Sequence, residues 1–302
     1  MVSIVISSIR PALLNGVLAS IEATVGIEHE VLVWDNRGSG KGLAGVYNDM
    51  SEKAGGEIVL FLHEDVTFQE PGWGLALTDI FRDPSIGLVG VAGSRYKSRA
   101  VSGWYTGLPG LNAYRIDHLT EGRTIHLRHP AIWPEHEVQT VTVDGVFMAC
   151  RKSLLKKVRF DEELCPGFHF YDIDFSLRAS KVSRVVVTDR IGILHHTLGG
   201  DFGDRWMDAA LSFHHRYRME LPASVSESDR IPDPEAATSR YWIDYLKRED
   251  LDFARKWRFL KADGLYLNPS NWYGILKLLV YRPFRLDIIH AFIKKLRGGA
   301  AR

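Results

Sequence analysis

The stretch Ile58-Val59-Leu60-Phe61-Leu62-His63-Glu64-Asp65 joins five consecutive apolar residues to three polar ones. A short apolar run that ends in polar residues is typical of a strand buried on both faces of a parallel sheet. Similar runs occupy residues 2–6, 31–34 and 86–91, and helix-like stretches lie between them at 11–25, 43–54 and 73–82. Strands that alternate with helices predict βαβ units, so we expect an α/β fold with a mostly parallel sheet flanked by helices.

The rest of the chain is less regular. Residues 95–137 are rich in Gly, Pro, Trp and His without periodicity, which predicts long loops. Apolar runs at 138–150, 185–188 and 191–195 predict further strands, and the Ser, Asp, Glu and Pro of 224–237 indicate a linker. We therefore expect one domain over residues 1–223, followed by a linker and a basic helical C-terminal region over residues 224–302.

Composition excludes several classes of protein. The 302 residues are 45% hydrophobic and 25% charged, which is not the composition of a collagen, a coiled coil or a disordered chain. The net charge is only +1, so no global field favours nucleic acid. The charge is nevertheless uneven: residues 255–302 carry eleven Lys and Arg against two Asp, whereas residues 1–254 carry 27 Lys and Arg against 35 Asp and Glu.

The basic end is also rich in aromatic and aliphatic residues, which alternate with the Lys and Arg. This pattern favours an amphipathic helix on the anionic inner-membrane surface. The alternative is a helical pair that packs on the rest of the chain or on a partner subunit. No apolar stretch is long enough to span a bilayer, and the N-terminus does not resemble a signal peptide. With only Cys150 and Cys165, the chain fits a reducing compartment, so we expect a cytoplasmic protein on the cytoplasmic face of the membrane.

Polar residues follow three of the predicted strands: Ser7 after the first, Asp35 and Asn36 after the second, and His63-Glu64-Asp65 after the third. In open parallel sheets, ligands bind at these carboxyl ends. Acidic groups at neighbouring strand ends suit a divalent metal that in turn binds phosphates, although Asp35 and Asp65 could instead cap turns. The glycines at 40–45 match a dinucleotide-binding spacing, but they lie six residues beyond the second strand, which argues against that site.

Two later clusters also carry candidate chemistry. Asp172 and Asp174 precede a helix-like stretch and lie among aromatic residues. The helix dipole would stabilise their ionised form and desolvation would oppose it, so the residues leave open a general base or simple N-capping. His195 and His196 end a predicted strand, where one imidazole could bind a metal or both could be structural.

In their order and spacing, these segments resemble the family 2 glycosyltransferases with the GT-A (Rossmann-like) fold, closest to the family-2-like group typified by a streptomycin-biosynthesis protein domain. The resemblance covers residues 1 to about 200. It is carried by residues 2–6, 33–36, 61–66, 72–73, 87–94, 143–148, 160–162, 169–174 and 195–196.

The resemblance implies roles for individual residues. Ser7, Asp35, Asn36, His63, Glu64 and Asp65 would bind the nucleotide-sugar, with Asp35 at the base and 63–65 at the Asp-X-Asp position. Asp65 would face a divalent metal, Mn²⁺ or Mg²⁺, and His195 or His196 would add a ligand. Asp172 would be the catalytic base, and Asp174 would support the local arrangement. His63 departs from the pattern, which has an acidic residue there.

The resemblance also implies an activity. It is inverting transfer of a sugar from a nucleoside-diphosphate sugar, favouring UDP or dTDP, to a hydroxyl of a glycan or lipid-linked acceptor in bacterial surface polysaccharide synthesis. Trp104, Trp133 and His169 would contact the acceptor, although Trp104 and Trp133 could equally pack in a small apolar core. Two alternatives stay open. A metal-dependent nucleotidyltransferase would be expected to carry a glycine-rich loop after the first strand, and a non-catalytic glycan-binding relative would be compatible with His63.

Overall fold

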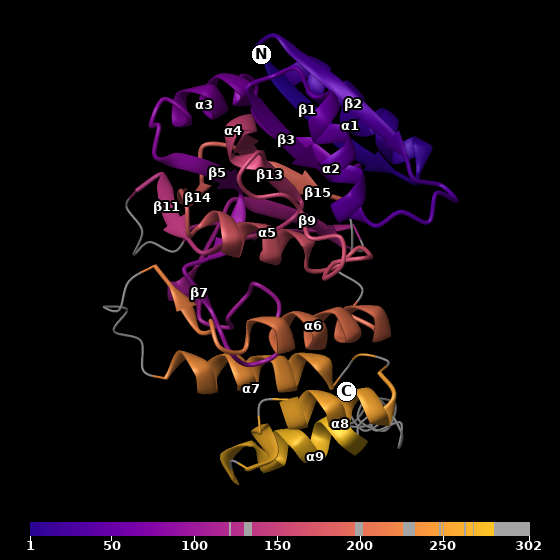
Figure 1. Ribbon diagram of the computed structural model, residues 1–302, viewed down its shortest axis with the longest axis vertical. Helices are drawn as coiled ribbons and strands as arrows, with labels where there is room; N and C mark the ends of the chain where they lie inside the picture. Colours follow the sequence, from indigo (N-terminus) through magenta and orange to yellow (C-terminus); the bar gives the residue numbers. More distant parts are fainter. Residues whose placement is uncertain are drawn as a thin grey trace, which may run out of the picture.

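The computed structural model describes residues 1–120, 122–129, 135–196, 202–225, 233–247, 249, 251–262, 264–267 and 269–280. A seven-stranded sheet forms the upper part of the molecule in Figure 1, and helices α6 to α9 lie below it. The strand order is β11-β14-β5-β13-β3-β1-β2. The strands are β1 (Val2–Ser8), β2 (His29–Asp35), β3 (Ile58–Leu62), β5 (Ile86–Gly90), β11 (Glu137–Thr140), β13 (Phe147–Arg151) and β14 (Arg184–Thr188).

Strands β1, β2, β3, β5 and β14 run in one direction. Strand β13 runs antiparallel between β3 and β5, and β11 runs antiparallel to β14 at the edge. The predicted α/β architecture with a mostly parallel sheet is therefore confirmed. The connecting helices are α1 (Pro11–Thr24), α2 (Leu43–Lys53), α3 (Trp73–Ile80), α4 (Lys152–Leu155) and α5 (Tyr171–Ala179).

Both faces of the sheet are covered. Alternate residues of β3 belong to different apolar clusters: Val59 and Phe61 pack with α2 and α5, whereas Leu60 and Leu62 pack with α1 and α3. The strands read as continuous apolar runs because neither face meets water. The polar residues that follow β3 consequently begin only where this strand ends, at His63.

The prediction of long loops over residues 95–137 is wrong in part. This region contains β7 (Tyr96–Lys97), β8 (Asn112–Tyr114), β9 (Ile116–Thr120) and β10 (Arg123–Leu127), and β6 (Ala92–Ser94) precedes it. They form small sheets, β10-β9-β15-β4, β12-β6-β8 and β16-β7, with β4 (Val66–Phe68), β12 (Thr142–Val143), β15 (Ile193–His195) and β16 (Ala223–Ser224). Strands of two to five residues are too short to show a period, and partners distant in sequence pair with them.

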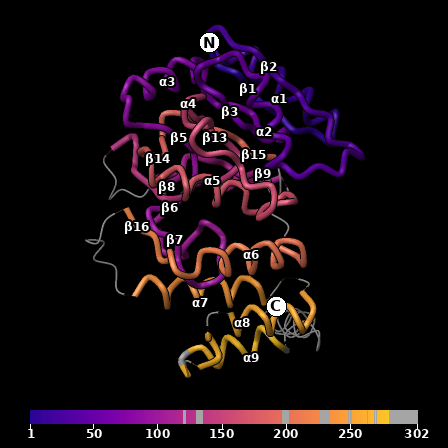
Figure 2. The backbone as a smooth tube through the Cα atoms, viewed as in Figure 1, coloured from indigo at the N-terminus to yellow at the C-terminus, as the bar shows by residue number. Residues whose placement is uncertain are grey.

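Four longer helices follow the sheet: α6 (Asp204–Tyr217), α7 (Pro234–Leu246), α8 (Phe253–Ala262) and α9 (Trp272–Val280). Short 3₁₀ turns occupy Pro109–Leu111, Leu265–Leu267 and Pro269–Asn271. Of the predicted linker, Ser224 lies in β16 and Pro234–Ala237 lie in α7, while 226–232 fall outside the described residues. Figure 2 shows β7 and β16 side by side between the sheet and these helices.

The helices after the sheet share its core. Trp206 of α6 stacks on Trp242 of α7 with ring centroids 5.0 Å apart, and both belong to the cluster on the α5 face of the sheet. The Trp242 indole N–H donates to the Tyr105 carbonyl at 2.9 Å. Arg255 of α8 forms ion pairs with Asp204 and Asp208 of α6 at 3.0 and 2.8 Å. Part of the basic segment therefore neutralises acidic groups of α6.

Asp174 joins α5 to α6. Its carboxylate has no exposed surface, and it accepts hydrogen bonds from the Tyr217 hydroxyl at 2.6 Å and from Arg178 Nε at 3.1 Å. Removing one partner of a buried charge pair leaves the other charge uncompensated, which is strongly destabilising.

We expect Asp174→Ala to lower the free energy of unfolding by about 3 kcal/mol, because Arg178 loses its counter-charge in a largely buried site. Tyr217→Phe removes only one hydroxyl donor and should lower it by about 1 kcal/mol. Urea unfolding followed by circular dichroism measures both values. Equal losses of stability in the two variants would contradict the role of Asp174 as the buried charge that binds both Tyr217 and Arg178.

Candidate active site

A cavity of about 310 Å³ lies between the small sheets and helices α5, α6 and α7. Its walls include His63 after β3, Asp144 after β12, Asp172 in α5 and His195 in β15. Trp104 and His169, predicted as acceptor contacts, also line it, and Trp133 lies outside the described residues. A larger cavity of about 710 Å³ beside α6, α7 and α8 contains none of the predicted site residues among those described.

Asp172 lies in the first turn of α5. The N-cap position is taken by Phe170, in the left-handed region at φ 68°, so Asp172 does not cap the helix. Its Oδ2 accepts a hydrogen bond from the Gly145 backbone N–H at 2.9 Å. Burial, and next the charge of Asp144, raise the pKa of Asp172 to about 7, against the backbone hydrogen bonds that lower it. Desolvation therefore changes the pKa of Asp172 more than the backbone hydrogen bonds at the start of α5 do.

Gly145 allows this close approach. A Cβ atom on Gly145 would lie 2.1 Å from the hydroxyl oxygen of Tyr171 and 3.2 Å from Cβ of Asp172. Real Cβ atoms do not come that close to another atom, so any larger residue would push the turn away from α5. Glycine is therefore required here for contact with the carboxylate of Asp172.

Asp144 is a site residue that sequence reasoning missed. Its Oδ2 accepts from the Trp104 indole N–H at 2.6 Å, and its Oδ1 accepts from the Val146 backbone N–H at 2.8 Å. Asp144 orients Trp104 at the cavity wall and raises the pKa of Asp172 by repulsion. An Asp-Gly pair is also an ordinary turn signal, so nothing local marks Asp144 as part of a site.

His63, Asp65 and His195 form a cluster whose ligand atoms lie within 4.8 Å of one another. Asp65 Oδ1 lies 3.2 Å from His195 Nε2 and 4.0 Å from His63 Nδ1. Burial alone would raise the pKa of Asp65, but His195, His63 and Arg10 outweigh it and hold this pKa well below its usual range. The carboxylate is therefore ionised and available to a cation.

Of the two adjacent histidines, His195 lies beside Asp65. His196 is exposed and instead shares a hydrogen bond of 2.6 Å with the Thr67 hydroxyl. Nε2 of His195 faces Asp65 Oδ1 at 3.2 Å, and its Nδ1 is buried without a hydrogen-bond partner among the described residues. An imidazole nitrogen beside an ionised carboxylate is a typical pair of metal ligands, so the donor set fits a divalent cation.

The other predicted nucleotide contacts lie near the ends of β1 and β2 and in the turn after β3. Glu64 is buried, and it accepts from the Ser8 hydroxyl at 2.6 Å and from the backbone N–H groups of Ile9 and Arg10. Through these hydrogen bonds, the carboxylate of Glu64 holds the loop that follows β1. Ser7 lies within β1, opposite Trp34 of β2.

Asp35 and Asn36 lie outside the cavity lining. Asp35 is exposed, and its hydrogen bonds with Arg37 lower its pKa to about 2. The Asn36 backbone N–H donates to the Ser8 carbonyl at 2.8 Å, so this loop runs beside the end of β1. Asp174 is likewise not in the lining, because it is committed to Tyr217 and Arg178.

Solved structures with a similar course of the chain include GalNAc-T7, TarS and a mannosyltransferase. GalNAc-T7 with UDP, GalNAc and Mn²⁺ is 10% identical, with a TM-score of 0.46, over 65% of this chain and 43% of that one. TarS 1-349 of S. aureus with UDP is 15% identical, with a TM-score of 0.45, over 95% and 91%. The mannosyltransferase PcManGT of Pyrobaculum calidifontis, with GDP-Man and Mn²⁺, is 13% identical, with a TM-score of 0.47, over 93% and 86%. At these scores none of the likenesses bears on the function of this chain.

No curated protein sequence matches the chain. A family model described as "Glycosyltransferase like family" matches residues 11–198, which is more than half of the sequence. The matched span contains His63, Asp65, Asp172 and His195. By that match, the chain belongs to the glycosyltransferase-like family.

Proposed function

We propose that this protein, as a member of the family-2-like group, transfers a sugar with inversion from a nucleoside-diphosphate sugar to a hydroxyl of an acceptor. One observation carries the proposal. The same cavity is lined by His63 and His195 of the candidate metal cluster and by Asp172, whose pKa is raised to about 7. A cation site and a carboxylate base on one cavity are the two groups that this reaction needs.

In the proposed reaction Asp172 is the general base. An acceptor oxygen attacks the anomeric carbon of the donor sugar as the bond from that carbon to the diphosphate oxygen breaks. The acceptor proton passes to Asp172, and the electron pair of the broken bond leaves with the diphosphate. The Gly145 N–H holds one carboxylate oxygen in place, so the other oxygen accepts the proton.

The leaving diphosphate needs a positive charge. Neither Lys nor Arg occurs among the described residues that line the cavity. Asp65, His195 and His63 would hold a divalent cation, Mn²⁺ or Mg²⁺, which would neutralise the developing charge on the diphosphate. We propose a UDP- or dTDP-sugar as donor, with Ser7, Asp35 and Asn36 beside its nucleotide.

Much of the remaining cavity lining is aromatic. It is built by Trp104, Tyr105, Phe168, Phe202, Trp206, Tyr241, Trp242 and Tyr245. Large apolar rings with a few polar groups suit the faces of uncharged sugar rings. We propose that the sugar end of a glycan or lipid-linked acceptor of a bacterial surface polysaccharide lies there, beside His169.

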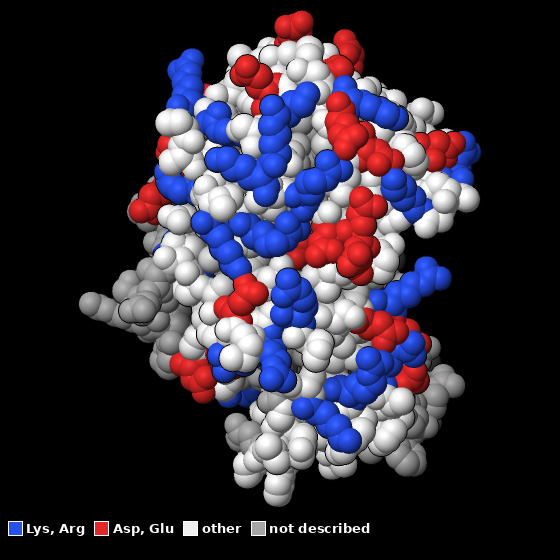
Figure 3. All heavy atoms as spheres, in the orientation of Figure 1, with Lys and Arg blue, Asp and Glu red and all other residues white. Residues whose placement is uncertain are grey.

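We also propose that α9 contacts an anionic membrane surface. Trp272, Tyr273 and Leu276 are at least 60% exposed, and Leu267 next to them is 70% exposed. Figure 3 shows a largely uncharged surface at the lower end of the molecule, where Figure 1 places α9. In the described part of the chain, every helix is too short or too polar to cross a bilayer. Exposed aromatic groups in a chain segment with a net charge of +9 suit anionic headgroups.

We expect Asp172→Asn to lower kcat by about 10²–10⁴-fold, because the variant has no base for the acceptor proton. In the unmodified enzyme, kcat/KM should rise with pH through about 7, since Asp172 acts only when ionised. Transfer assays over a pH series measure both effects.

Two controls accompany this prediction. Asp144→Asn removes a neighbouring negative charge, so the rise in kcat/KM should move to lower pH.

Asp172→Asn should also raise Tm above pH 7. Because folding raises the pKa of Asp172 above 3.8, the protonated carboxyl stabilises the folded protein at low pH. This stabilisation is lost as the pH rises through about 7 and Asp172 ionises, and an Asn side chain avoids the loss. Near-normal transfer by folded Asp172→Asn would remove it as the base.

We expect one nucleoside diphosphate among UDP, dTDP, GDP and CDP to raise Tm only when Mn²⁺ or Mg²⁺ is present. A ligand at a hundred times its Kd stabilises the native state by about 2.7 kcal/mol. Asp65→Ala should abolish the shift, and His196→Gln, in which an exposed histidine is lost, should keep it. A metal-independent shift in the unmodified protein would contradict the proposed site.

We expect the full-length protein to pellet with vesicles that contain phosphatidylglycerol, and to bind less at high salt because charge attraction is screened. A triple replacement of Trp272, Tyr273 and Leu276 by Ser should weaken binding by about tenfold or more. Leu75→Ser is the matched control, since Leu75 is 58% exposed on α3, far from α9 in the sequence. Equal binding by the triple variant would overturn the proposal.

A further inference from the structure

His118 of β9 is a third histidine beside the candidate metal cluster. Strand β9 pairs in parallel with β15, and His118 is the direct partner of His195 in that register. The two imidazole rings lie 5.4 Å apart between centroids, and the rings of His63 and His195 lie 5.9 Å apart. All three histidines line the same cavity. They come from three separate segments, the turn after β3, β9 and β15.

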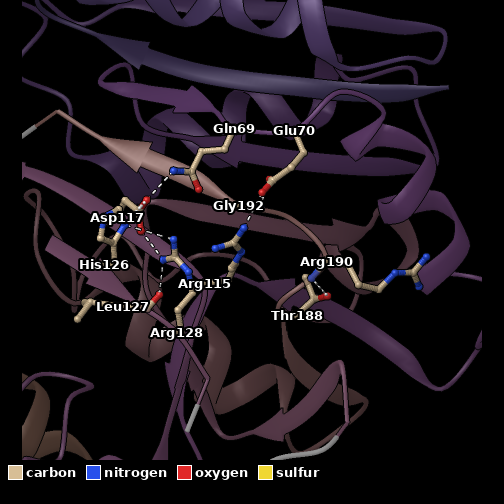
Figure 4. Close-up of polar contacts among 10 residues, drawn as sticks. All are labelled: Gln69, Glu70, Arg115, Asp117, His126, Leu127, Arg128, Thr188, Arg190 and Gly192. Atoms are coloured by element: carbon tan, nitrogen blue, oxygen red, sulfur yellow. Dashed lines mark hydrogen bonds and ion pairs between the residues drawn. The ribbon is translucent and has the colours of Figure 1, made fainter. Parts of the chain in front are cut away.

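The direction of His118 is fixed by its neighbour Asp117. Figure 4 shows Asp117 held by Gln69, His126 and Arg128. Gln69 Nε2 donates to Asp117 at 2.6 Å, and His126 Nδ1 lies 2.9 Å away. Successive side chains of a strand point to opposite faces, so these bonds on one face turn His118 to the other, toward His195.

Two polar atoms of this group lack partners. Nδ1 of His118 and Nδ1 of His195 are buried without a hydrogen bond to any described residue, whereas Nε2 of His195 faces Asp65. Unsatisfied buried polar atoms are rare and point to a strained site or to a missing ion or water. Unpartnered nitrogens on two facing rings, one of which also faces the carboxylate of Asp65, point to a cation.

We propose that His118 joins His63, His195 and Asp65 in one metal site, and that this set of three imidazoles and one carboxylate selects transition-metal ions over Mg²⁺. The inference rests on the proposed metal-dependent transfer and adds a ligand and a metal class to it. Mg²⁺ prefers oxygen ligands in octahedral geometry, whereas imidazole favours Fe²⁺, Co²⁺, Ni²⁺ and Zn²⁺. His63 at the first Asp-X-Asp position has the same effect, because it replaces an oxygen donor with nitrogen.

The same geometry would arise if His118 merely packed against His195. In that case its replacement would change stability but not the number of nitrogen ligands on a bound ion. A readout of the metal itself therefore separates the two roles.

The test measures binding of Co²⁺, Mn²⁺ and Mg²⁺ alone to the full-length protein by calorimetry. The visible absorption of bound Co²⁺ and the nitrogen couplings of bound Mn²⁺ in pulsed electron paramagnetic resonance report the imidazole ligands. We expect Co²⁺ to bind more tightly than Mn²⁺, and Mg²⁺ to bind about 100-fold more weakly than Co²⁺. The Mn²⁺ spectrum of the unmodified protein should show three imidazoles, a result that needs no variant.

His118→Gln should weaken Co²⁺ binding by about 10–100-fold and alter its absorption, with a smaller effect on Mg²⁺. His136→Gln is the matched control and should bind Co²⁺ normally, because His136 is 69% exposed, is bonded to Asp189 and is not among the residues that line the cavity. Two imidazoles on Mn²⁺, unchanged Co²⁺ binding by folded His118→Gln, or equal affinity for Mg²⁺ and Co²⁺ would overturn the inference. Sugar transfer driven equally by Mg²⁺ would overturn it and leave the proposed function standing. Tight Co²⁺ binding without any nucleotide binding would contradict the proposed function and leave the inference about the metal site standing.

Discussion

The burial of the sheet on both faces is the constraint on which the rest of the structure depends. Alternate side chains of β3 enter two different apolar clusters, so no polar group can leave this strand before its end. His63 and Asp65 therefore emerge together at the carboxyl edge, where β1 also ends and Glu64 holds its following loop. This edge is the usual ligand site of an open α/β sheet, and the metal cluster lies there for that reason.

The small antiparallel sheets build the other half of the site. They place His195 beside Asp65 and His118 beside His195, and the turn after β12 brings Asp144 and Gly145 against α5. Two carboxylates then share a poorly solvated cavity, which raises the pKa of Asp172 to about 7. That arrangement is unfavourable for stability above this pH and favourable for the proposed base, an opposition between stability and activity that is common at active sites.

The helices after the sheet complete the cavity and also reach the surface. Trp206 and Trp242 stack on each other within the aromatic lining, and Arg255 connects α8 to α6 through Asp204 and Asp208. The basic residues at the start of the C-terminal segment thus serve packing within the molecule. The exposed aromatic residues of α9 remain available to the proposed membrane surface.

The sequence by itself determined the βαβ order, the strands from 2–6 to 86–91 and the polar residues at their ends, because periodicity and chain breaks are local properties. It also singled out Asp65, Asp172 and the 195–196 pair as candidates, but not the role of Asp144 or the place of His118. Only the tertiary structure separated His195 from His196, turned Asp174 toward Tyr217, and decided that desolvation prevails at Asp172. Those outcomes depend on register between distant strands and on burial by remote segments, which no local pattern records.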